Sequence, residues 1–558
     1  MTKAFYDEIL REVKNRVYNG KEFARLKREL AKKYLLPKIP TNIDILMRAP
    51  LEEMSFYRSR LQTKPVRSIS GVSPVAIMTK PIACPHGKCT MCPGGPNSSF
   101  GDVPMSYTGQ EPSTMRAMRN DYDSYLITFN RLEQFALLGH NFDKVEFIIM
   151  GGTFPAFPKE YQEEVVTYAF KALNDFSDLF YDGDTFLWGK FKDFFELPIA
   201  DFHDQDRVAR IKQKLYDMKG KSTLEREHQR NETAKVRSVA LCIETKPDWG
   251  LQSHGDEMLR LGCTRVELGV QSVYEDVIKY IHRGHTIQDT KDSLRILRDQ
   301  GFKVAAHYMP GLPLTDYDRD LAGLHELWDN PDYRPDMLKL YPCMVSKGTA
   351  LYYEYKKGTF KPMDADTAAK MLADWMPSIP RYCRIMRIQR DVPTKQWEAG
   401  VEMTNFRQYL MERYNPECND IRAREPMGRT IDWANVSLHK EVYEASGGTE
   451  HFMSMVDDSN DILIGFIRMR YPHASLRTEF TNNSAIIREL HVYGTATAIG
   501  DEGSVQHRGM GKQLIAAAED QARSDGKDKL LVISGVGVRP YYYKLGYELD
   551  GPYVSKHL

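Results

Sequence analysis

CPHGKCTMCPGG is the sequence of residues 84–95, and it contains three cysteines: Cys84, Cys89 and Cys92. Pro85 and Gly87 allow this loop to wrap tightly, so the three thiols can face one centre. Three soft thiolates suit either zinc or an iron–sulfur cluster. A zinc ion would also accept His86 as a fourth ligand, which makes a closed Cys3His site the structural alternative to a cluster.

Short apolar, β-branched runs alternate with longer helical patterns from about residue 70 onward. Six of these runs are candidate strands, at residues 72–79, 145–152, 238–245, 265–272, 303–310 and 337–345. Strands that alternate with helices in this way predict an α/β fold with a parallel sheet. Such sheets bind ligands at the carboxyl ends of their strands, where the βα loops gather.

The chemically distinctive residues of this region fall at those strand ends. After the cysteine loop they are, in chain order, Gly151, Gly152, Thr153, Glu244, Gln271, His307, Tyr308, Met309 and Pro310. We therefore expect one rim of the sheet to carry the chemistry. A [4Fe-4S] cluster held by three cysteines leaves one iron open for a substrate. Because glycine backbone groups lie beside the same rim, the pattern favours iron over a closed zinc site.

Length and composition describe a globular protein with more than one domain. A chain of 558 residues is too long for a single hydrophobic core. Hydrophobic residues make up 42% and charged residues 27%, which is ordinary for a soluble folded protein. The apolar runs are too short or too interrupted to span a bilayer, and the eight cysteines do not resemble a secreted disulfide framework. We expect a cytoplasmic protein without a membrane segment.

The loop CPHGKCTMCPGGP on a six-stranded sheet resembles the radical S-adenosylmethionine (SAM) family, with a first spacing wider than the common three-residue gap and Met91 in place of the usual aromatic residue. The resemblance implies a partial (βα) barrel of six strands, with a [4Fe-4S] cluster on the three cysteines. The open iron would bind the amino and carboxyl groups of SAM. The family's glycine motif for the methionine amine is matched by Gly151, Gly152 and Thr153. Reduction would then give a 5′-deoxyadenosyl radical.

A second compact segment with mixed α and β patterns ends the chain. Its sequence QHRGMGKQLI opens a predicted helix, and Gln506, Gly509 and Gly511 would let backbone N–H groups approach a diphosphate. The predicted strand RELHVYG (488–494) precedes this turn, and clustered tyrosines in RPYYYKLGYELDGPYV follow it. A phenol can protonate a departing thiolate, which the release of coenzyme A requires.

Strand, glycine turn, helix and tyrosines in this order resemble the GNAT acetyltransferase family, an α+β fold. The resemblance implies that four residues line the acetyl and pantetheine channel: Glu489, Leu490, His491 and Val492. It also implies that three residues cradle the pyrophosphate: Met510, Gly511 and Lys512. Tyr542 would lie beside the thioester as a catalytic residue, with Tyr541 next to it.

Both halves together resemble the family of Elongator catalytic subunits, in stretches such as IETKPD, RPDMLKLYPCMV and RELHVYG along nearly the whole chain except residues 175–206. This resemblance implies carboxymethylation of the wobble uridine in a tRNA anticodon, with acetyl-CoA as the donor. The deoxyadenosyl radical would abstract hydrogen from the acetyl methyl group, that carbon would add to C5 of uridine, and hydrolysis would free the product. Lys144 matches a position that contacts acetyl-CoA in the family.

The N-terminal residues 1–40 carry 11 Lys or Arg against 5 Asp or Glu, although the whole chain has no net charge. Such a run is either a solvated helix face or an arm that contacts phosphates. Five residues are candidates for contacting tRNA: Arg25, Lys27, Arg28, Lys32 and Lys33. The implied partners are the anticodon stem-loop of tRNA and an electron donor, while a homodimer or Elongator-type accessory subunits stay open.

We expect four segments: a basic helical tRNA-binding arm (1–70), a radical SAM domain (71–385), a connector (386–440) and a GNAT domain (441–558). Three further cysteines near the connector could close around zinc with a histidine or water, although isolated buried cysteines are the commoner finding. They are Cys343, Cys383 and Cys418. The aromatic and acidic stretch 175–206 could be a lid, an insertion that packs on a neighbouring domain, or a flexible excursion.

Two rival functions stay open on the sequence alone. The first is a protein lysine acetyltransferase in which the barrel is an inactive scaffold, which predicts acetyl transfer to peptides without SAM. The second is a zinc-bearing RNA-binding adaptor, which predicts a colourless protein that turns over no thioester.

Overall fold

The computed structural model describes residues 2–63, 71–198, 204–390, 392–493 and 509–558. The chain divides into two compact units, of which the first comprises Met1–Val75, Ser124–Val145 and Thr167–Ser238. The second comprises Ala76–Asp123, Glu146–Val166 and Val239–Leu558. No helix within the described ranges is both long and apolar enough to cross a membrane.

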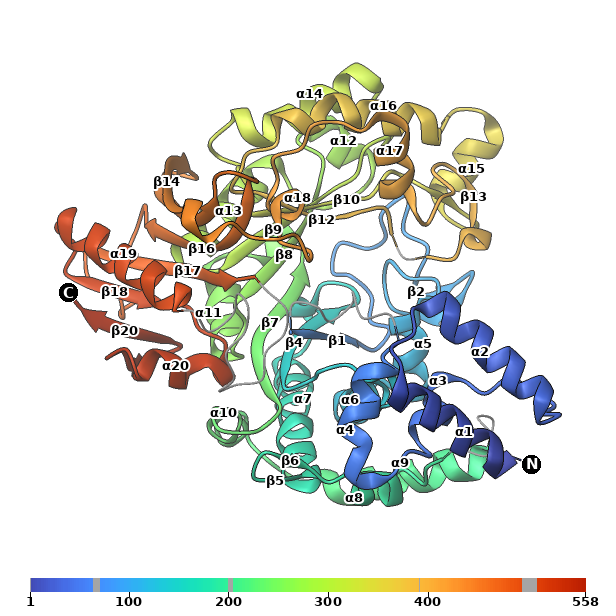
Figure 1. Cartoon of the computed structure of the whole chain (residues 1–558). Helices are drawn as coiled ribbons and strands as arrows, with labels where there is room; N and C mark the ends of the chain where they lie inside the picture. The colour runs from blue at the N-terminus through green and yellow to red at the C-terminus, as the bar shows by residue number, and fades with distance from the viewer. Residues whose placement is uncertain (1, 64–70, 199–203, 391, 494–508) are drawn as a thin grey trace. The chain divides into compact units, whose positions relative to one another are not determined.

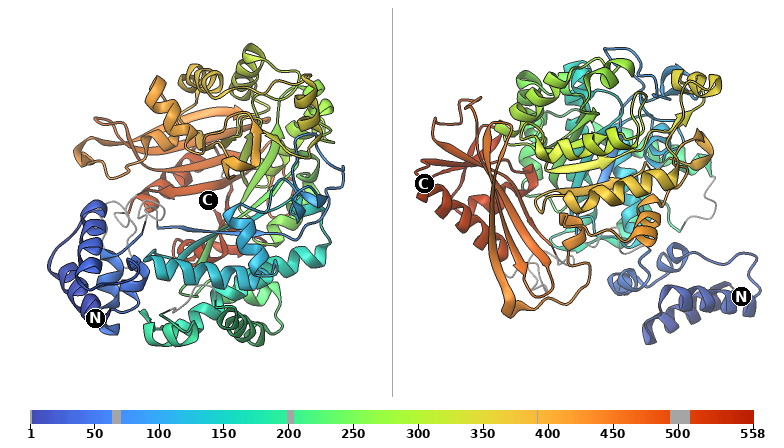
Figure 2. Two further views of the ribbon diagram at one scale, coloured as in Figure 1. Left: turned by 90° about the vertical axis from the view of Figure 1, so that its right-hand side faces the viewer. Right: turned by 90° about the horizontal axis from the view of Figure 1, so that it is seen from above.

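The first unit begins with a group of short helices, shown in blue in Figure 2. They are α1 (Thr2–Asn15), α2 (Gly20–Lys33), α3 (Asn42–Leu46), the 3-10 turn η1 (Leu51–Glu53) and α4 (Met54–Arg60). Helix α2 starts at Asn19, whose side chain accepts from two backbone N–H groups, while Glu22 completes a capping box. Its buried face presents Phe23 and Leu30, so the basic residues of this helix fall mostly on its exposed side.

The rest of the first unit is helical with one small hairpin. Its elements are α6 (Ser124–Leu138), α7 (Lys159–Phe180), β5 (Tyr181–Asp182), β6 (Thr185–Phe186), α8 (Trp188–Phe194), α9 (Gln205–Lys219) and α10 (Leu224–Asn231). The aromatic stretch for which the sequence left three alternatives open, residues 175–206, is packed where it is described. Phe180 contacts the rings of Phe186 and Phe191, and Phe176 also contacts Phe142. Aromatic burial therefore orders this insertion inside the first unit.

A seven-stranded sheet forms the α/β part of the chain, and at least half of each strand belongs to the second unit. The strands, in spatial order, are β1 (Ser73–Met78), β4 (Lys144–Met150), β7 (Arg237–Thr245), β8 (Arg265–Gln271), β9 (Lys303–Tyr308), β10 (Met337–Leu340) and β12 (Arg384–Ile388). The pairs from β7 to β12 are all parallel. All six predicted strands are present, which confirms the α/β barrel-like class, and β12 adds a seventh.

Helices and short turns connect these strands, and α14 and α16 lie side by side outside the sheet (Figure 1). The helices are α5 (Pro112–Arg119), α11 (Gln252–Arg260), α12 (Glu275–Tyr280), α13 (Ile287–Asp299), α14 (Tyr317–Asp329), α15 (Ala350–Lys357), α16 (Ala365–Trp375), α17 (Phe406–Tyr414) and α18 (Ile421–Arg424). The short strands are β2 (Gly95–Ser98), β3 (Gly101–Val103), β11 (Val345–Ser346) and β13 (Trp397–Ala399). The 3-10 turns are η3 (Phe154–Ala156), η4 (Pro247–Trp249), η5 (Met376–Ser378), η6 (Thr394–Gln396) and η7 (Trp433–Asn435).

The C-terminal segment forms a second seven-stranded sheet, which is mixed. Its order is β14 (Val436–Ala445), β15 (Gly448–Asp457), β16 (Ile462–Tyr471), β17 (Ser484–Val492), β18 (Lys529–Val532), β20 (Tyr553–His557) and β19 (Glu548–Asp550). It also contains α19 (Met510–Ser524), η8 (Val536–Val538) and α20 (Arg539–Tyr543). Leu514, Ile515 and Ala518 of α19 pack against the sheet residues in one buried core. An α/β domain followed by an α+β domain is the fold class that the sequence predicts.

Candidate active site

The cysteine loop lies after β1, and the chain holds it in a tight turn. Cys89 and Cys92 are buried, while Cys84 is half-buried. Gly94 must be glycine here, because a Cβ atom would lie 2.3 Å from the carbonyl oxygens of Pro104 and Tyr107. The loop is thereby fixed against residues 104–107.

Each of the three sulfur atoms has a hydrogen-bond donor beside it. The hydroxyl of Thr153 is 3.6 Å from the sulfur of Cys84. The backbone N–H of Ser106 donates to Cys92 at 3.3 Å, and the guanidinium of Arg283 is 3.6 Å from Cys89. Donors of this kind stabilise thiolates and tune the centre that the thiolates bind.

The loop also brings His86 to one of its cysteines, since Nε2 of His86 lies 3.3 Å from the sulfur of Cys89. In the parts of the chain that the structure describes, the one group of three or more His, Cys, Asp or Glu with ligand atoms all within 4.8 Å of one another contains neither His86 nor a cysteine. A closed four-ligand zinc geometry is therefore not formed by the described residues, and the glycine motif beside the loop is what favours a cluster.

The glycine motif lies beside the cysteine loop, as the rim hypothesis predicts. Gly151 and Gly152 follow β4 with φ of 110° and 88°, values that L side chains rarely adopt. A Cβ atom on Gly151 would lie 2.7 Å from the hydroxyl oxygen of Thr79. Thr153 is buried and reaches Cys84, so the structure brings these two sequence motifs into direct contact.

Inside the sheet, four charged or titratable side chains converge below this rim. Glu244, Glu267 and His307 have ligand atoms within 4.8 Å of one another. Strand register explains the convergence, because Glu244 is the neighbour of Glu267 and Lys339 the neighbour of His307. The sequence pointed to Glu244 and His307 at strand ends but missed Glu267 and Lys339 within strands. A charged residue inside an otherwise buried strand was the available signal.

Glu267 has three charged or titratable partners, and its charge is compensated. Its carboxylate lies 2.8 Å from Nε2 of His307, 3.2 Å from Arg265, and in direct contact with the ammonium of Lys339. Burial alone would raise the pKa of Glu267, but these partners, Lys339 foremost, hold it well below its usual range. Burial likewise opposes the charge of Lys339, yet Glu267 and Glu244 raise the pKa of this lysine. Both groups are therefore charged at neutral pH.

Aromatic and cationic side chains connect this interior group to the cysteine loop. The hydroxyl of Tyr107 lies 3.5 Å from Glu244, and Tyr341 packs edge-on against His307 with ring centroids 5.4 Å apart. Arg390 lies over both tyrosine rings, at 5.7 and 5.9 Å, and donates to the carbonyl of Ser106 at 2.6 Å. Ser106 in turn contacts Cys92. Gln271 ends β8 with a φ of 70°, in the left-handed region.

The start of α19 presents a second site, at an opening in the C-terminal sheet. Strand β18 pairs with β17 only from Ser484 to Ile487, and β17 continues to Val492 paired with β16 alone. Helix α19 begins next to this splay, after Gly509 in a left-handed conformation with a φ of 79°. Among the residues that the structure describes, no side chain caps its first turn, so backbone N–H groups at Met510, Gly511 and Lys512 can bind an anion. Gln506 lies outside the described residues.

The two tyrosines named as catalytic candidates occupy different environments. The hydroxyl of Tyr541 lies against the first turn of α19, where a Cβ on Gly511 would be only 2.9 Å from it. Burial raises the pKa of Tyr541, so its phenol is protonated at neutral pH. Tyr542 is 5% exposed and packs in the core between α19 and the sheet. The geometry places Tyr541, rather than Tyr542, nearer to the helix start.

The end of β17 offers mainly its backbone to a ligand. The carboxylate of Glu489 is bound to Arg468 at 3.0 Å and to Lys303 at 3.5 Å. His491 stacks on Phe466, and burial lowers the pKa of His491 to about 4, so its ring is neutral. Leu490 and Val492 are half-buried.

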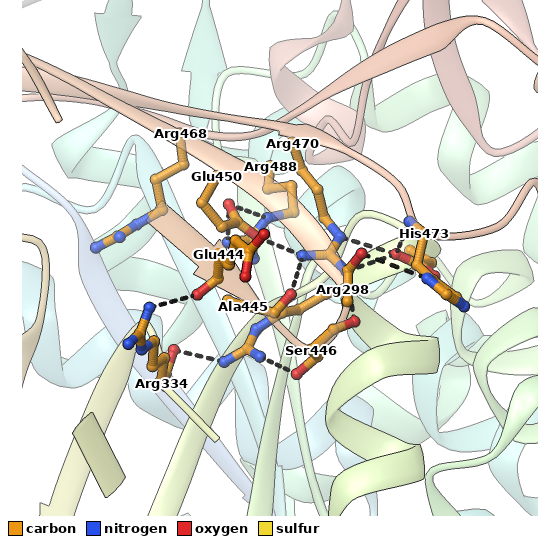
Figure 3. Close-up of polar contacts among 12 residues, drawn as sticks. Arg298, Arg334, Glu444, Ala445, Ser446, Glu450, Arg468, Arg470, His473 and Arg488 are labelled. Atoms are coloured by element: carbon orange, nitrogen blue, oxygen red, sulfur yellow. Dashed lines mark hydrogen bonds and ion pairs between the residues drawn. The ribbon is translucent and has the colours of Figure 1, made fainter. Parts of the chain in front are cut away.

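Buried ion pairs join the C-terminal sheet to the barrel strands (Figure 3). Arg488 donates twice to Asp336 at 2.7 Å and also to Glu450 at 2.7 Å. Arg470 bonds Glu450 at 2.9 Å and Asp299 at 2.7 Å. These side chains are all at most 2% exposed. A fully paired network of this kind holds two surfaces in one register.

Two other predicted sites stay predictions. Cys343 packs in an apolar core with Val345 and Leu351, whereas Cys418 lies 3.2 Å from Asp420. None of Cys343, Cys383 and Cys418 belongs to a convergent group of three or more ligands within the residues described. Lys144 begins β4 in the first unit and is half-buried, and its contact with acetyl-CoA is a prediction from the family resemblance.

Comparisons with known proteins cover nearly the whole chain. Residues 2–69 match the ELP3 N-terminal domain, 81–324 the radical SAM superfamily, and 335–415 the radical SAM C-terminal domain. The tRNA uridine(34) acetyltransferase of Methanocaldococcus jannaschii is 41% identical over 532 residues, which is 93% of this chain and 90% of that protein. Elongator complex protein 3 of Saccharomyces cerevisiae is 38% identical over 546 residues, 95% of this chain and 90% of that protein.

One solved structure agrees with this result. The archaeal Methanocaldococcus infernus Elp3 with an N-terminal deletion is 37% identical, covers 88% of this chain and 100% of its own, and superposes with a TM-score of 0.71. Identity at this level, over almost the full length of both proteins, goes beyond a shared fold. The chain belongs to the family of tRNA uridine(34) acetyltransferases and Elongator complex protein 3.

Proposed function

We propose that this protein modifies the wobble uridine of tRNA, using acetyl-CoA and radical SAM chemistry to form 5-carboxymethyluridine. The observation that carries the proposal is the contact between the three-cysteine loop and the glycine motif, in the same compact unit as a helix start suited to a diphosphate. The relatives named for tRNA uridine(34) match the chain through all of these elements.

Cys84, Cys89 and Cys92 would hold a [4Fe-4S] cluster, and the backbone at Gly151 and Gly152 would bind the methionine end of SAM. When bound and reduced, the cluster supplies the electron that cleaves the SAM sulfonium. The donors from Thr153, Ser106 and Arg283 set the charge on the three sulfurs. The close approach of the loop to residues 104–107 would limit the access of water to its inner side.

The C-terminal domain would act as a GNAT-type acetyl-CoA site. The first turn of α19 would bind the pyrophosphate, and the backbone of β17 beyond Ile487 would accept hydrogen bonds from the pantetheine amides. Tyr541, with its phenol protonated, is the proposed donor to the developing thiolate. Lys144 would add a contact to acetyl-CoA, as the family resemblance implies.

The basic face of α2 would contact the tRNA backbone. Arg28 and Lys32 are exposed, whereas Lys27 donates to Asn42 at 2.8 Å and Lys33 pairs with Glu8 at 2.7 Å. Burial also lowers the pKa of Lys27. Among the five candidates, Arg28 and Lys32 should therefore contribute most to phosphate binding, because they break no internal contact.

A reconstituted assay tests the proposal against a protein lysine acetyltransferase with an inactive barrel. The full chain, reconstituted anaerobically with iron and sulfide, is incubated with tRNA, acetyl-CoA, SAM and dithionite, and the nucleosides are analysed by mass spectrometry. The proposal predicts a carboxymethylated uridine that requires SAM and all three cysteines. Acetylated peptide without SAM, and no modified uridine, would favour the rival function.

A further inference from the structure

The interior of the barrel sheet contains an acidic side chain whose hydrogen-bonding capacity is not filled. In the part of the chain that the structure describes, two donors lie beside Glu244, the Tyr107 hydroxyl at 3.5 Å and the Lys339 ammonium at 3.8 Å, and ligand atoms of Glu267 and His307 lie within 4.8 Å. Both donor distances exceed those of ordinary hydrogen bonds. Nearby Glu267, in contrast, is completely buried and held by three partners. Glu244 therefore has room to accept from a ligand.

Solvent reaches this group, which a ligand-binding residue requires. The side chain of Glu244 is 17% exposed, that of His307 12% and that of Lys339 10%. The group sits near the carboxyl end of the strands, where parallel sheets bind ligands. It is also close to the cysteine loop, because Tyr107 follows Ser106, whose N–H bonds Cys92.

The pair of charges fits the Watson–Crick edge of uracil. That edge presents the N3–H donor next to carbonyl acceptors, and Glu244 next to Lys339 presents an acceptor beside a donor. Cytosine presents the N4–H₂ donor, the N3 acceptor and the O2 acceptor, so with the ring held in the same position a carboxylate facing N3 would meet a lone pair. Recognition through N3 and a neighbouring carbonyl also leaves the C5–C6 edge of the ring free to react.

Planar groups suited to stacking lie around the same pair. The guanidinium of Arg390 lies over the rings of Tyr107 and Tyr341. Proteins recognise single unstacked RNA bases in this way, with aromatic or arginine planes against the faces of the base and polar groups at its edge.

We propose that Glu244 and Lys339 select the target base, with Glu244 accepting from uracil N3–H and Lys339 donating to an adjacent carbonyl. Stacking on Tyr107, Tyr341 or Arg390 would hold the ring. This inference rests on the proposed function, because it names the residues that recognise the uridine of that reaction.

The test is a double-mutant cycle that combines the substitution Glu244→Ala in the enzyme with N3-methylation of the target base. Synthetic anticodon stem-loops carry uridine, N3-methyluridine or cytidine at position 34, and kcat/KM is measured with the full reconstituted chain by nucleoside mass spectrometry. For the unaltered enzyme, N3-methylation should lower kcat/KM by about 10- to 100-fold, the effect expected when a hydrogen bond to a charged group is lost. For Glu244→Ala, kcat/KM with uridine should already be lower by a similar factor, and N3-methylation should lower kcat/KM by no more than about threefold further.

Two companion variants separate recognition from folding. Glu244→Gln keeps the shape of the side chain and adds an N–H donor, so its discrimination against cytidine should fall by about tenfold or more. Glu146→Gln is the matched control, since Glu146 is 21% exposed on the neighbouring strand β4 and pairs with Arg265 at 2.9 Å. Its uridine-to-N3-methyluridine ratio should equal that of the unaltered enzyme.

The outcomes distinguish this inference from the function on which it rests. An unaltered enzyme that modifies no uridine overturns the proposed function and the inference with it. The inference alone is overturned by three results together. The unaltered enzyme modifies uridine, and N3-methylation lowers kcat/KM by the same factor for the unaltered enzyme and for Glu244→Ala. In addition, Glu244→Gln discriminates against cytidine as strongly as the unaltered enzyme does.

Discussion

Replacing Arg488 with methionine should loosen the contact between the barrel strands and the C-terminal sheet. Arg488 is completely buried and donates to Asp336, Glu450 and the carbonyl of Phe302. The substitution leaves the Asp336 and Glu450 carboxylates buried with fewer partners. Glu450 keeps Arg470, and Asp336 keeps the N–H of Val304 at 2.9 Å, which limits the loss.

The expected cost is that of removing one partner from a buried ion pair, about 3–5 kcal/mol. Hydrogen exchange followed by mass spectrometry should therefore show faster exchange by about 10²- to 10⁴-fold in the segments 299–308 and 484–492. Arg477→Met is the matched control, because Arg477 bonds Asp256 and Glu479 at the same contact but is 20% exposed. Its cost should be at most about 1 kcal/mol.

A further variant tests the physical reason. Arg488→Met combined with Asp336→Asn removes both charges, so much of the lost protection should return. Exchange in the two segments that is the same for Arg488→Met and the unaltered protein would refute the claim that this network holds the two sheets together.

Other expectations follow from the same contacts. Replacing Cys84, Cys89 and Cys92 with alanine should remove visible iron–sulfur absorbance and all uridine product while far-UV circular dichroism is retained; retained product would contradict the assignment. Tyr541→Phe should lower acetyl-CoA hydrolysis by about 10²-fold with little change in stability, whereas Tyr542→Phe should leave turnover within a few-fold; the reverse result would restore Tyr542 as the catalytic candidate. Neutralising Arg28 and Lys32 should weaken tRNA binding and reduce the slope of log affinity against log salt by about 2, and an unchanged slope would exclude α2 as a phosphate-binding arm. Burial alone would raise the pKa of Glu489, but Lys303 and Arg468 lower it to about 2. Because the pKa is depressed in the folded state, the contribution of Glu489 to stability should persist above about pH 4.5 and be lost as the pH falls toward 2. Hydrogen-exchange protection of residues 484–492 that stays constant from pH 5 to 2.5 would contradict this expectation.

The sequence predicted the barrel strands because their apolar, β-branched runs are continuous, as in sheets covered on both faces. Strand β12 was not predicted from its sequence, because Arg384 and Arg387 interrupt its apolar residues and Arg387 is exposed. Strand β14 was also missed, because it is an edge strand with mostly exposed residues and no regular alternation. Patterns of hydrophobicity report burial, so strands that bury little are hard to predict from them.

Part of the candidate active site could be predicted from the sequence, and part of it could not. Loops at the carboxyl ends of parallel strands must converge, so the meeting of Thr153 with Cys84 could be expected from chain order alone. The partners of Glu244 could not, because they depend on which strands are neighbours and on their register. The connector zinc site stays a prediction: Cys343 packs in an apolar core, Cys383 lies near enough to Cys418 to be influenced by its charge, and none of the three belongs to a convergent group of ligands among the residues described.

The central claim is that the three-cysteine centre and the acetyl-CoA site act on one substrate within one enzyme. Its most direct test supplies acetyl-CoA deuterated at the acetyl methyl group to the anaerobically reconstituted chain with SAM, tRNA and dithionite, and measures deuterium in the 5′-deoxyadenosine that forms. Deuterium in that product is the predicted result. 5′-Deoxyadenosine without deuterium, or none at all from fully metallated protein, would contradict the account.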